Sequence, residues 1–126
     1  MIIGLGLDLV EKDRIAAIYN RYGLKFIRKI LTAKELERLP GNPTDYLASR
    51  FAAKEAGVKA LGTGFSQGIT LGHLEILNNS QGKPELYFSG PARERALEMG
   101  VDIIHLSLSH GRDAATAVVI LEKVGQ

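Results

Sequence analysis

Residues 50–64 read RFAAKEAGVKALGTG, a run of good helix formers that ends in a glycine-rich segment. Glu55 and Lys59 stand four positions apart, so a helix places both side chains on one face, where they can reach the same ligand. Asp8, from the N-terminal segment, completes a set of two carboxylates and a lysine that suits Mg²⁺-assisted phosphoryl chemistry. The same spacing is also typical of a solvent-exposed ion pair, so the pattern alone leaves both interpretations open.

The composition predicts a single domain. The chain has 126 residues, of which 45% are hydrophobic and 24% charged, and we expect residues 1–126 to form one compact unit. It contains no cysteine, which excludes disulfides and thiolate metal sites. No apolar run approaches the ~20 residues of a membrane span, and the N-terminal segment lacks the basic flank of a signal peptide. We therefore expect a cytoplasmic protein without a membrane contact.

Basic side chains are concentrated in residues 12–38, although the net charge of the whole chain is only +2. The segment carries Lys12, Arg14, Arg21, Lys25, Arg28, Lys29, Lys34 and Arg38 against Asp13, Glu35 and Glu37. Such a patch is typical of a solvated face, of a surface for an acidic protein or of a nucleic-acid contact, and the residues alone leave all three open. No nucleic-acid motif accompanies it.

The first half of the chain predicts one strand followed by helices. Residues 2–10 alternate, with Leu5, Leu7 and Leu9 on one face and Gly6 and Asp8 on the other, so the glycines of that face clear space beside the carboxylate. Helical patterns follow over residues 11–22 and 24–31, and Thr32 and Glu35 form a capping box for a helix over 33–39. A long helix then begins at a cap on Thr44 or Asp45 and ends at Gly62.

The second half predicts two pairs of strands separated by a helix. Strands are expected over 72–79 and 85–89, with Pro84 at the beginning of the second, and a helix runs from Pro91 to Met99. Two last strands, 102–109 and 114–121, flank a turn that includes His110. The order indicates an α+β domain, an antiparallel sheet with helices packed on it.

Taken together, four motifs resemble the holo-[acyl-carrier-protein] synthases, the small bacterial branch of the 4'-phosphopantetheinyl transferases. They are IGLGLDLV at residues 3–10, RFAAKEA continuing to KALGTG at 50–64, NSQGKP at 79–84 and HLSLSH at 105–110. The likeness spans nearly the whole chain. It implies the transferase fold and the transfer of the phosphopantetheine arm of coenzyme A to a serine of apo-acyl carrier protein in fatty acid biosynthesis. Mg²⁺ is the implied cofactor, and adenosine 3',5'-bisphosphate the implied product.

The resemblance also implies roles for individual residues. Asp8 and Glu55 match the two metal-binding acids, and Lys59 matches the lysine that reaches the phosphates of coenzyme A; these three are the expected catalytic residues. Glu55 is expected to deprotonate the serine, directly or through a metal-bound water. The other expected contacts to coenzyme A are Arg50, the loop of Gly62, Thr63 and Gly64, Pro84 on the adenosine side, and His110 near the 3'-phosphate. Gly111 stands where a hydroxyl residue is frequent in the family.

The same family implies two kinds of partner. Arg14, Arg21 and Lys25 fall where the first helices of the family meet the acidic carrier protein. A homotrimer with active sites between subunits is expected, and nucleic acid is not. Two rival hypotheses come from other classes: a non-catalytic module whose basic helices bind an acidic protein or nucleic acid, and a metal-dependent phosphohydrolase. By itself, His110 has the pattern of a turn residue.

Overall fold

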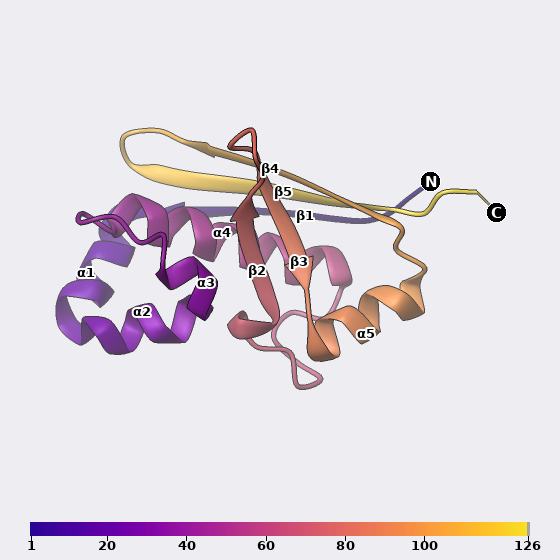
Figure 1. The fold of residues 1–126 in the computed structure, drawn as a ribbon, viewed down its shortest axis with the longest axis horizontal. Coiled ribbons are helices and arrows are strands. Elements are labelled where there is room, and N and C mark those ends of the chain that lie inside the picture. The colour runs from indigo at the N-terminus through magenta and orange to yellow at the C-terminus, as the bar shows by residue number, and fades with distance from the viewer. Residues whose placement is uncertain (126) are drawn as a thin grey trace.

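The computed structural model describes residues 1–125 and has the expected mixture of helices and antiparallel strands (Figure 1). The strands are β1 (Ile2–Glu11), β2 (Leu74–Asn78), β3 (Pro84–Phe88), β4 (Ile103–His110) and β5 (Ala114–Glu122). The helices are α1 (Lys12–Tyr22), α2 (Leu24–Ile30), α3 (Ala33–Leu36), α4 (Thr44–Leu61) and α5 (Gly90–Met99), with a short 3-10 turn η1 (Leu71–His73).

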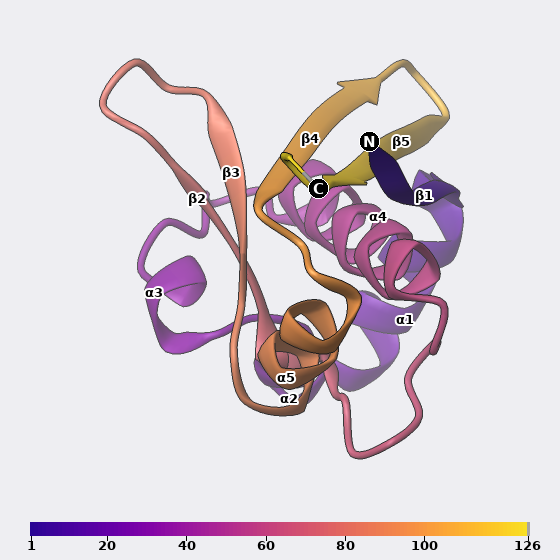
Figure 2. The same ribbon diagram turned by 90° about the vertical axis from the view of Figure 1, so that its right-hand side faces the viewer.

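The strands form two sheets instead of one. β1, β5 and β4 make a three-stranded antiparallel sheet in that order, and β2 and β3 form a separate hairpin. Both views show α4 running beneath the three-stranded sheet, with the hairpin crossing beside it (Figures 1 and 2). The first and last strands are neighbours, so the amino group of Met1 donates to the carbonyl of Lys123.

Helix α4 is buried on nearly all sides, because the sheet covers one face and the hairpin another. Its small residues let these layers approach: Ala52, Ala53 and Ala56 have no exposed surface, and a Cβ on Gly57 would lie 2.6 Å from the Leu74 side chain of β2. No helix among residues 1–125 is long and apolar enough to cross a membrane.

The glycine face of β1 packs against α4, and its leucine face is exposed. A Cβ on Gly4 would lie 2.4 Å from the carbonyl oxygen of Ala60, so the space that the glycines clear is filled by helix backbone. On the other face, Leu5, Leu7 and Leu9 are 63%, 64% and 60% exposed. Their cross-strand neighbours on β5 are Ile120, Val118 and Thr116. We call these six residues the open sheet face.

Several predicted boundaries were wrong by a few residues. Helix α3 ends at Leu36 instead of 39, although the Thr32–Glu35 capping box is present. Neither Thr44 nor Asp45 caps α4, since Pro43 holds the N-cap position and its side chain has no oxygen to accept a capping hydrogen bond. The segment 71–73 is η1, not strand, and His110 ends β4 instead of lying in the turn. Gly62, as predicted, ends α4 in the left-handed conformation.

Candidate active site

Asp8 and Lys59 meet between β1 and α4. The Lys59 ammonium donates to Asp8 Oδ1 at 2.9 Å and to the carbonyl oxygen of Leu7 at 3.1 Å. The hydrogen bond to Asp8 raises the pKa of Lys59 above its usual value, so the ammonium form is retained. Asp8 points toward α4 because it shares the glycine face of its strand, where the helix backbone comes closest.

Glu55 lies within electrostatic reach of the same pair. Burial raises the pKa of Glu55, and the negative charge of Asp8 raises it further, whereas Lys59 and Arg14 act in the opposite direction. The structure therefore brings together the three residues that the sequence predicted as catalytic, from two elements. Arg14, which the resemblance linked only to the carrier protein, also lies within electrostatic reach of Glu55.

These side chains fit the requirements of Mg²⁺. Among residues 1–125, no group of three or more His, Asp or Glu side chains forms a metal cage. Mg²⁺ often takes only one or two protein carboxylates, however, and completes its shell with waters and substrate phosphates. Burial raises the pKa of Glu55, and the nearby charge of Asp8 raises it further, so a divalent cation between the two acids would stabilise the ionised form of Glu55.

The loop after α4 is tied to the end of the helix. The amides of Thr63 and Gly64 both donate to the carbonyl of Val58 at 3.3 Å, and Gly62 donates to Lys59. From α5, Arg95 Nε donates to the carbonyl of Leu61 at 3.0 Å. In this structure the loop amides thus bond to the end of the helix. The contact of this loop with coenzyme A stays a prediction.

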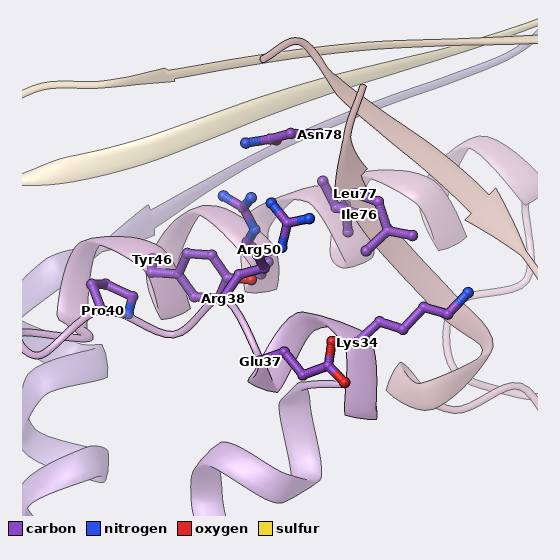
Figure 3. Close-up of a pocket in the computed structure, with 9 residues that line it drawn as sticks. All are labelled: Lys34, Glu37, Arg38, Pro40, Tyr46, Arg50, Ile76, Leu77 and Asn78. Atoms are coloured by element: carbon purple, nitrogen blue, oxygen red, sulfur yellow. The ribbon is translucent and has the colours of Figure 1, made fainter. Parts of the chain in front are cut away.

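A cavity of about 600 Å³ opens on another side of α4 (Figure 3). Its walls come from the α3 segment, from α4 and from β2, and its lining residues are Lys34, Glu37, Arg38, Pro40, Tyr46, Arg50, Ile76, Leu77 and Asn78. In Figure 3 the guanidinium groups of Arg38 and Arg50 point toward the side where Asn78 lies. The lining of the cavity has three cations and one acid, a balance of charge that favours an anion.

Arg50 is the best-defined cation of the cavity. Its guanidinium stacks on the Tyr46 ring at 4.1 Å from the centroid, and one terminal nitrogen donates to Ser49 at 3.1 Å. Its buried Nε has no hydrogen-bond partner within residues 1–125. A buried donor without an acceptor is costly, and because this atom is itself enclosed, a ligand in the cavity reaches it only if the side chain turns.

Two further residues that were predicted to contact coenzyme A lie apart from the carboxylates of Asp8 and Glu55. Pro84 is paired with Asn78 across the hairpin, which puts it next to a lining residue of the cavity. His110 stands at the end of β4, opposite Ala115 of β5, and does not line the cavity. Asp8, Glu55 and Lys59 do not line it either.

The basic helices expose the predicted partner residues. Arg14, Arg21 and Lys25 are solvent-exposed, whereas Lys12 is bound to Asp45 at 3.1 Å. Beside them lies a second cavity of about 470 Å³ between α1, α2, α4 and η1. It is lined by Ile18, Tyr22, Lys25, Phe26, Lys29, Ile30, Phe51 and Leu71. An apolar hollow with lysines at its rim suits an amphipathic segment of acidic character.

The sequence analysis did not predict which other residues line the cavity with Arg50. Lys34 and Arg38 were visible only as members of the basic stretch, although their spacing of four residues could have suggested a common face. Asn78 carried no signal, because its position depends on how the hairpin packs on α4.

Comparisons with known proteins identify the family of the chain. Residues 4–119 match the model of the 4'-phosphopantetheinyl transferase superfamily. A holo-[acyl-carrier-protein] synthase of Maridesulfovibrio salexigens is 56% identical over 124 residues, which cover 98% of this chain and all of the relative. The crystal structure of the synthase from Neisseria meningitidis matches with a TM-score of 0.88 and 40% identity, over 98% of this chain and all of that chain.

A solved structure from Bacillus anthracis is described as a holo-(acyl-carrier-protein) synthase in complex with CoA (3',5'-ADP). It matches with a TM-score of 0.80 and 38% identity, covering 98% of each chain. These matches extend over nearly the whole sequence and include the strand of Asp8 and the helix of Glu55. The chain therefore belongs to the 4'-phosphopantetheinyl transferase superfamily, as an enzyme of its holo-[acyl-carrier-protein] synthase family.

Proposed function

We propose that residues 1–126 form one transferase domain that moves the 4'-phosphopantetheine arm of coenzyme A to a serine of apo-acyl carrier protein for fatty acid synthesis. The reaction requires Mg²⁺ and releases adenosine 3',5'-bisphosphate. The observation that carries the proposal is the convergence of Asp8, Glu55 and Lys59 from β1 and α4. The names of the relatives and the coenzyme A complex of the Bacillus anthracis protein support the choice of substrates.

The chemistry follows from the charges of these groups. The serine oxygen forms a bond to the β-phosphorus, the bond from that phosphorus to the bridging oxygen breaks, and the nucleotide leaves with the electron pair. Lys59 turns from Asp8 to a phosphate oxygen and offsets the charge that develops there. Asp8 and Glu55 would hold Mg²⁺, which would supply Lewis-acid stabilisation of the diphosphate. Glu55 accepts the serine proton, directly or through a metal-bound water.

The basic cavity would hold the phosphate of the nucleotide that takes no part in the reaction. Arg50 precedes Glu55 by five residues, about 8 Å along the helix axis and roughly 140° around it, so a nucleotide that reaches both sites has to pass partly around α4. The guanidinium groups of Arg50 and Arg38 and the ammonium of Lys34 offer donors to phosphate oxygens. Pro84, beside Asn78, would border the adenosine.

The carrier protein would dock on α1 and α2. Arg14, Arg21 and Lys25 present positive charge to an acidic helix, and the apolar hollow beside Phe26 receives one of its side chains. Because Arg14 is also within electrostatic reach of Glu55, a carrier bound there brings its serine close to the diphosphate.

A second copy of the chain would cover the open sheet face. Three leucines in a row, each more than half exposed, are an apolar surface that isolated proteins rarely leave to water. We propose a homotrimer, in which His110 reaches the nucleotide of a neighbouring subunit. The cytoplasmic location expected from the sequence stays a prediction.

One assay tests the transferase against its rivals. The protein is incubated with Mg²⁺, coenzyme A and an apo-acyl carrier protein, and the carrier is analysed by intact mass for one added phosphopantetheine arm. A carrier of unchanged mass under several divalent metals would overturn the proposal. Release of nucleotide without carrier protein would favour the phosphohydrolase, and salt-sensitive binding without product would favour the non-catalytic module.

A further inference from the structure

Lys54 and Glu35 form an ion pair that is fully enclosed, with 0% of each side chain exposed. The Lys54 ammonium donates to Glu35 Oε1 at 2.7 Å, to the carbonyl of Leu71 at 3.1 Å and to the carbonyl of Ile30. All three of its donors are therefore used. They connect α4 to the end of α2, to α3 and to η1.

Glu35 extends the same network. Its Oε1 also accepts from the Thr32 amide at 2.9 Å, and its Oε2 accepts from the Ile76 amide of β2 at 2.9 Å. Its backbone carbonyl accepts from the Tyr46 hydroxyl at 2.8 Å. Thr32, in turn, accepts from the Glu35 amide and donates from its hydroxyl to Glu75 of β2.

The network joins the three walls of the basic cavity. Lys34 and Arg38 flank Glu35 on the α3 segment, Ile76 is both a wall residue and a partner of Glu35, and Arg50 lies one turn before Lys54 on α4. None of these walls is held to the others by a continuous sheet, since β2 pairs only with β3 among the described strands. Their separation depends on packing and on this network.

Stability is a weak reason to keep such a pair. Replacing a buried ion pair by apolar residues of similar volume is often neutral or stabilising, because the desolvation of two charges offsets their attraction. The directional bonds offer something that apolar packing lacks, a fixed spacing between backbone segments.

We propose that Lys54, Glu35 and Thr32 are positioning residues that set the spacing of the cavity walls and thereby its affinity for the phosphate end of coenzyme A. This inference rests on the proposed function for its ligand. Loss of the network should raise the KM for coenzyme A and leave kcat at saturating coenzyme A nearly unchanged, because Asp8, Glu55 and Lys59 are held by β1 and α4.

The matched test uses Thr32, which does not line the cavity. Thr32→Val removes the hydroxyl that bridges Glu35 and Glu75, whereas Thr32→Ser retains it. The Kd of adenosine 3',5'-bisphosphate by calorimetry and the KM for coenzyme A should each rise about 10-fold in Thr32→Val and stay at the wild-type value in Thr32→Ser. Glu35→Gln, which keeps the shape and removes the charge, should have a larger effect of the same kind.

A control separates positioning from stability. Ala96→Gly, in α5, lowers the thermal midpoint at a site away from the cavity and should leave the Kd unchanged. If Thr32→Val and Glu35→Gln both retain the wild-type Kd, or if kcat falls while KM stays constant, the positioning role is overturned. Should Glu35→Gln not fold, Thr32→Val decides the question alone.

Measurements on the ligand-free protein distinguish a failure of the positioning role from a failure of the proposed function. The amide resonance of Asn78 should shift in Thr32→Val and not in Thr32→Ser, whether or not coenzyme A is the substrate. Unchanged resonances would overturn the positioning role. If the two variants show this shift pattern but the wild-type protein binds no adenosine 3',5'-bisphosphate, the choice of ligand is overturned instead.

Discussion

The carbonyl oxygen of Ala56 lies where a side chain on Gly6 would have to be: a Cβ there would be 1.8 Å from that oxygen. Glycine is the residue that permits this approach of β1 to α4. The contact brings the strand of Asp8 against the helix of Glu55 and Lys59, so the spacing of the candidate active site depends on a position that carries no functional group.

Gly6→Ala should therefore reduce both stability and transfer. Separating strand and helix by one methyl group is expected to lower the free energy of unfolding by about 1–3 kcal/mol, measured by urea denaturation. Gly41→Ala is the control, because a Cβ at Gly41 meets no atom within 4 Å. Wild-type stability and activity in Gly6→Ala would contradict the importance of the contact.

Glu55→Gln should abolish transfer without unfolding the protein. Removing a general base typically costs at least about 10²-fold in rate, and the steady-state rate with apo-carrier measures it. Since burial and Asp8 both raise the pKa of Glu55, a neutral side chain is tolerated there and the thermal midpoint should not fall. Glu94→Gln, on the exposed side of α5, is the control. An active Glu55→Gln protein would remove Glu55 from the chemistry.

Tyr46 should ionise late in an alkaline titration. Burial raises the pKa of Tyr46 above 10.0, and the stability that its neutral form contributes is fully present below pH 10.0 and is lost as the pH rises through the higher folded value. Near-ultraviolet phenolate absorbance should show a late step that Tyr46→Phe removes. The pKa of Tyr87 is also raised, by its bond to Glu85, so Tyr87→Phe separates the two signals.

Leu7→Glu should dissociate the proposed homotrimer. The side chain lies in the middle of the open sheet face and is exposed in the single chain, so a charge there opposes association and leaves the fold intact. Light scattering should report a smaller mass, with unchanged circular dichroism. Leu97→Glu, equally exposed but on α5, should keep the mass of the wild type. A Leu7→Glu protein of wild-type mass would exclude this face as the interface.

Arg14→Glu should mainly weaken capture of the carrier protein. Reversing an exposed charge reduces electrostatic steering, so the KM for apo-carrier should rise, with the largest effect at low salt. Because Arg14 lowers the pKa of Glu55, a modest change in kcat is also expected. Arg93→Glu, on α5, is the control. Carrier affinity that is unchanged at low salt would refute docking on α1.

The features of the structure that were predicted correctly from the sequence depend on local signals. The Thr32–Glu35 capping box, the glycine end of α4 and the placement of Pro84 all follow from neighbouring residues. Alternation in β1 separated Asp8 from the leucines, but it could not say which face a helix would cover. That outcome depends on Ala56 and Ala60, more than forty positions away.

The burial of Lys54 is a second feature that local sequence signals do not predict. A lysine in a helix normally predicts a solvent-exposed position, and nothing near it in the sequence suggests otherwise. Its acid partner is 19 positions away, in a helix of one turn, and two of its acceptors are backbone carbonyls of other elements. Only the tertiary fold supplies these partners, so the network that joins the walls of the cavity could not be derived from the sequence.

Strand β1 has β5 as its neighbour in the three-stranded sheet, and these are the first and the final strands of the described chain. On the ribosome, Asp8 emerges early but has no edge to pair with until more than a hundred further residues have been made. The strand that carries the candidate metal ligand must wait, with its row of leucines exposed, until β5 has been made. Assembly of the candidate active site therefore depends on a contact between segments far apart in the sequence.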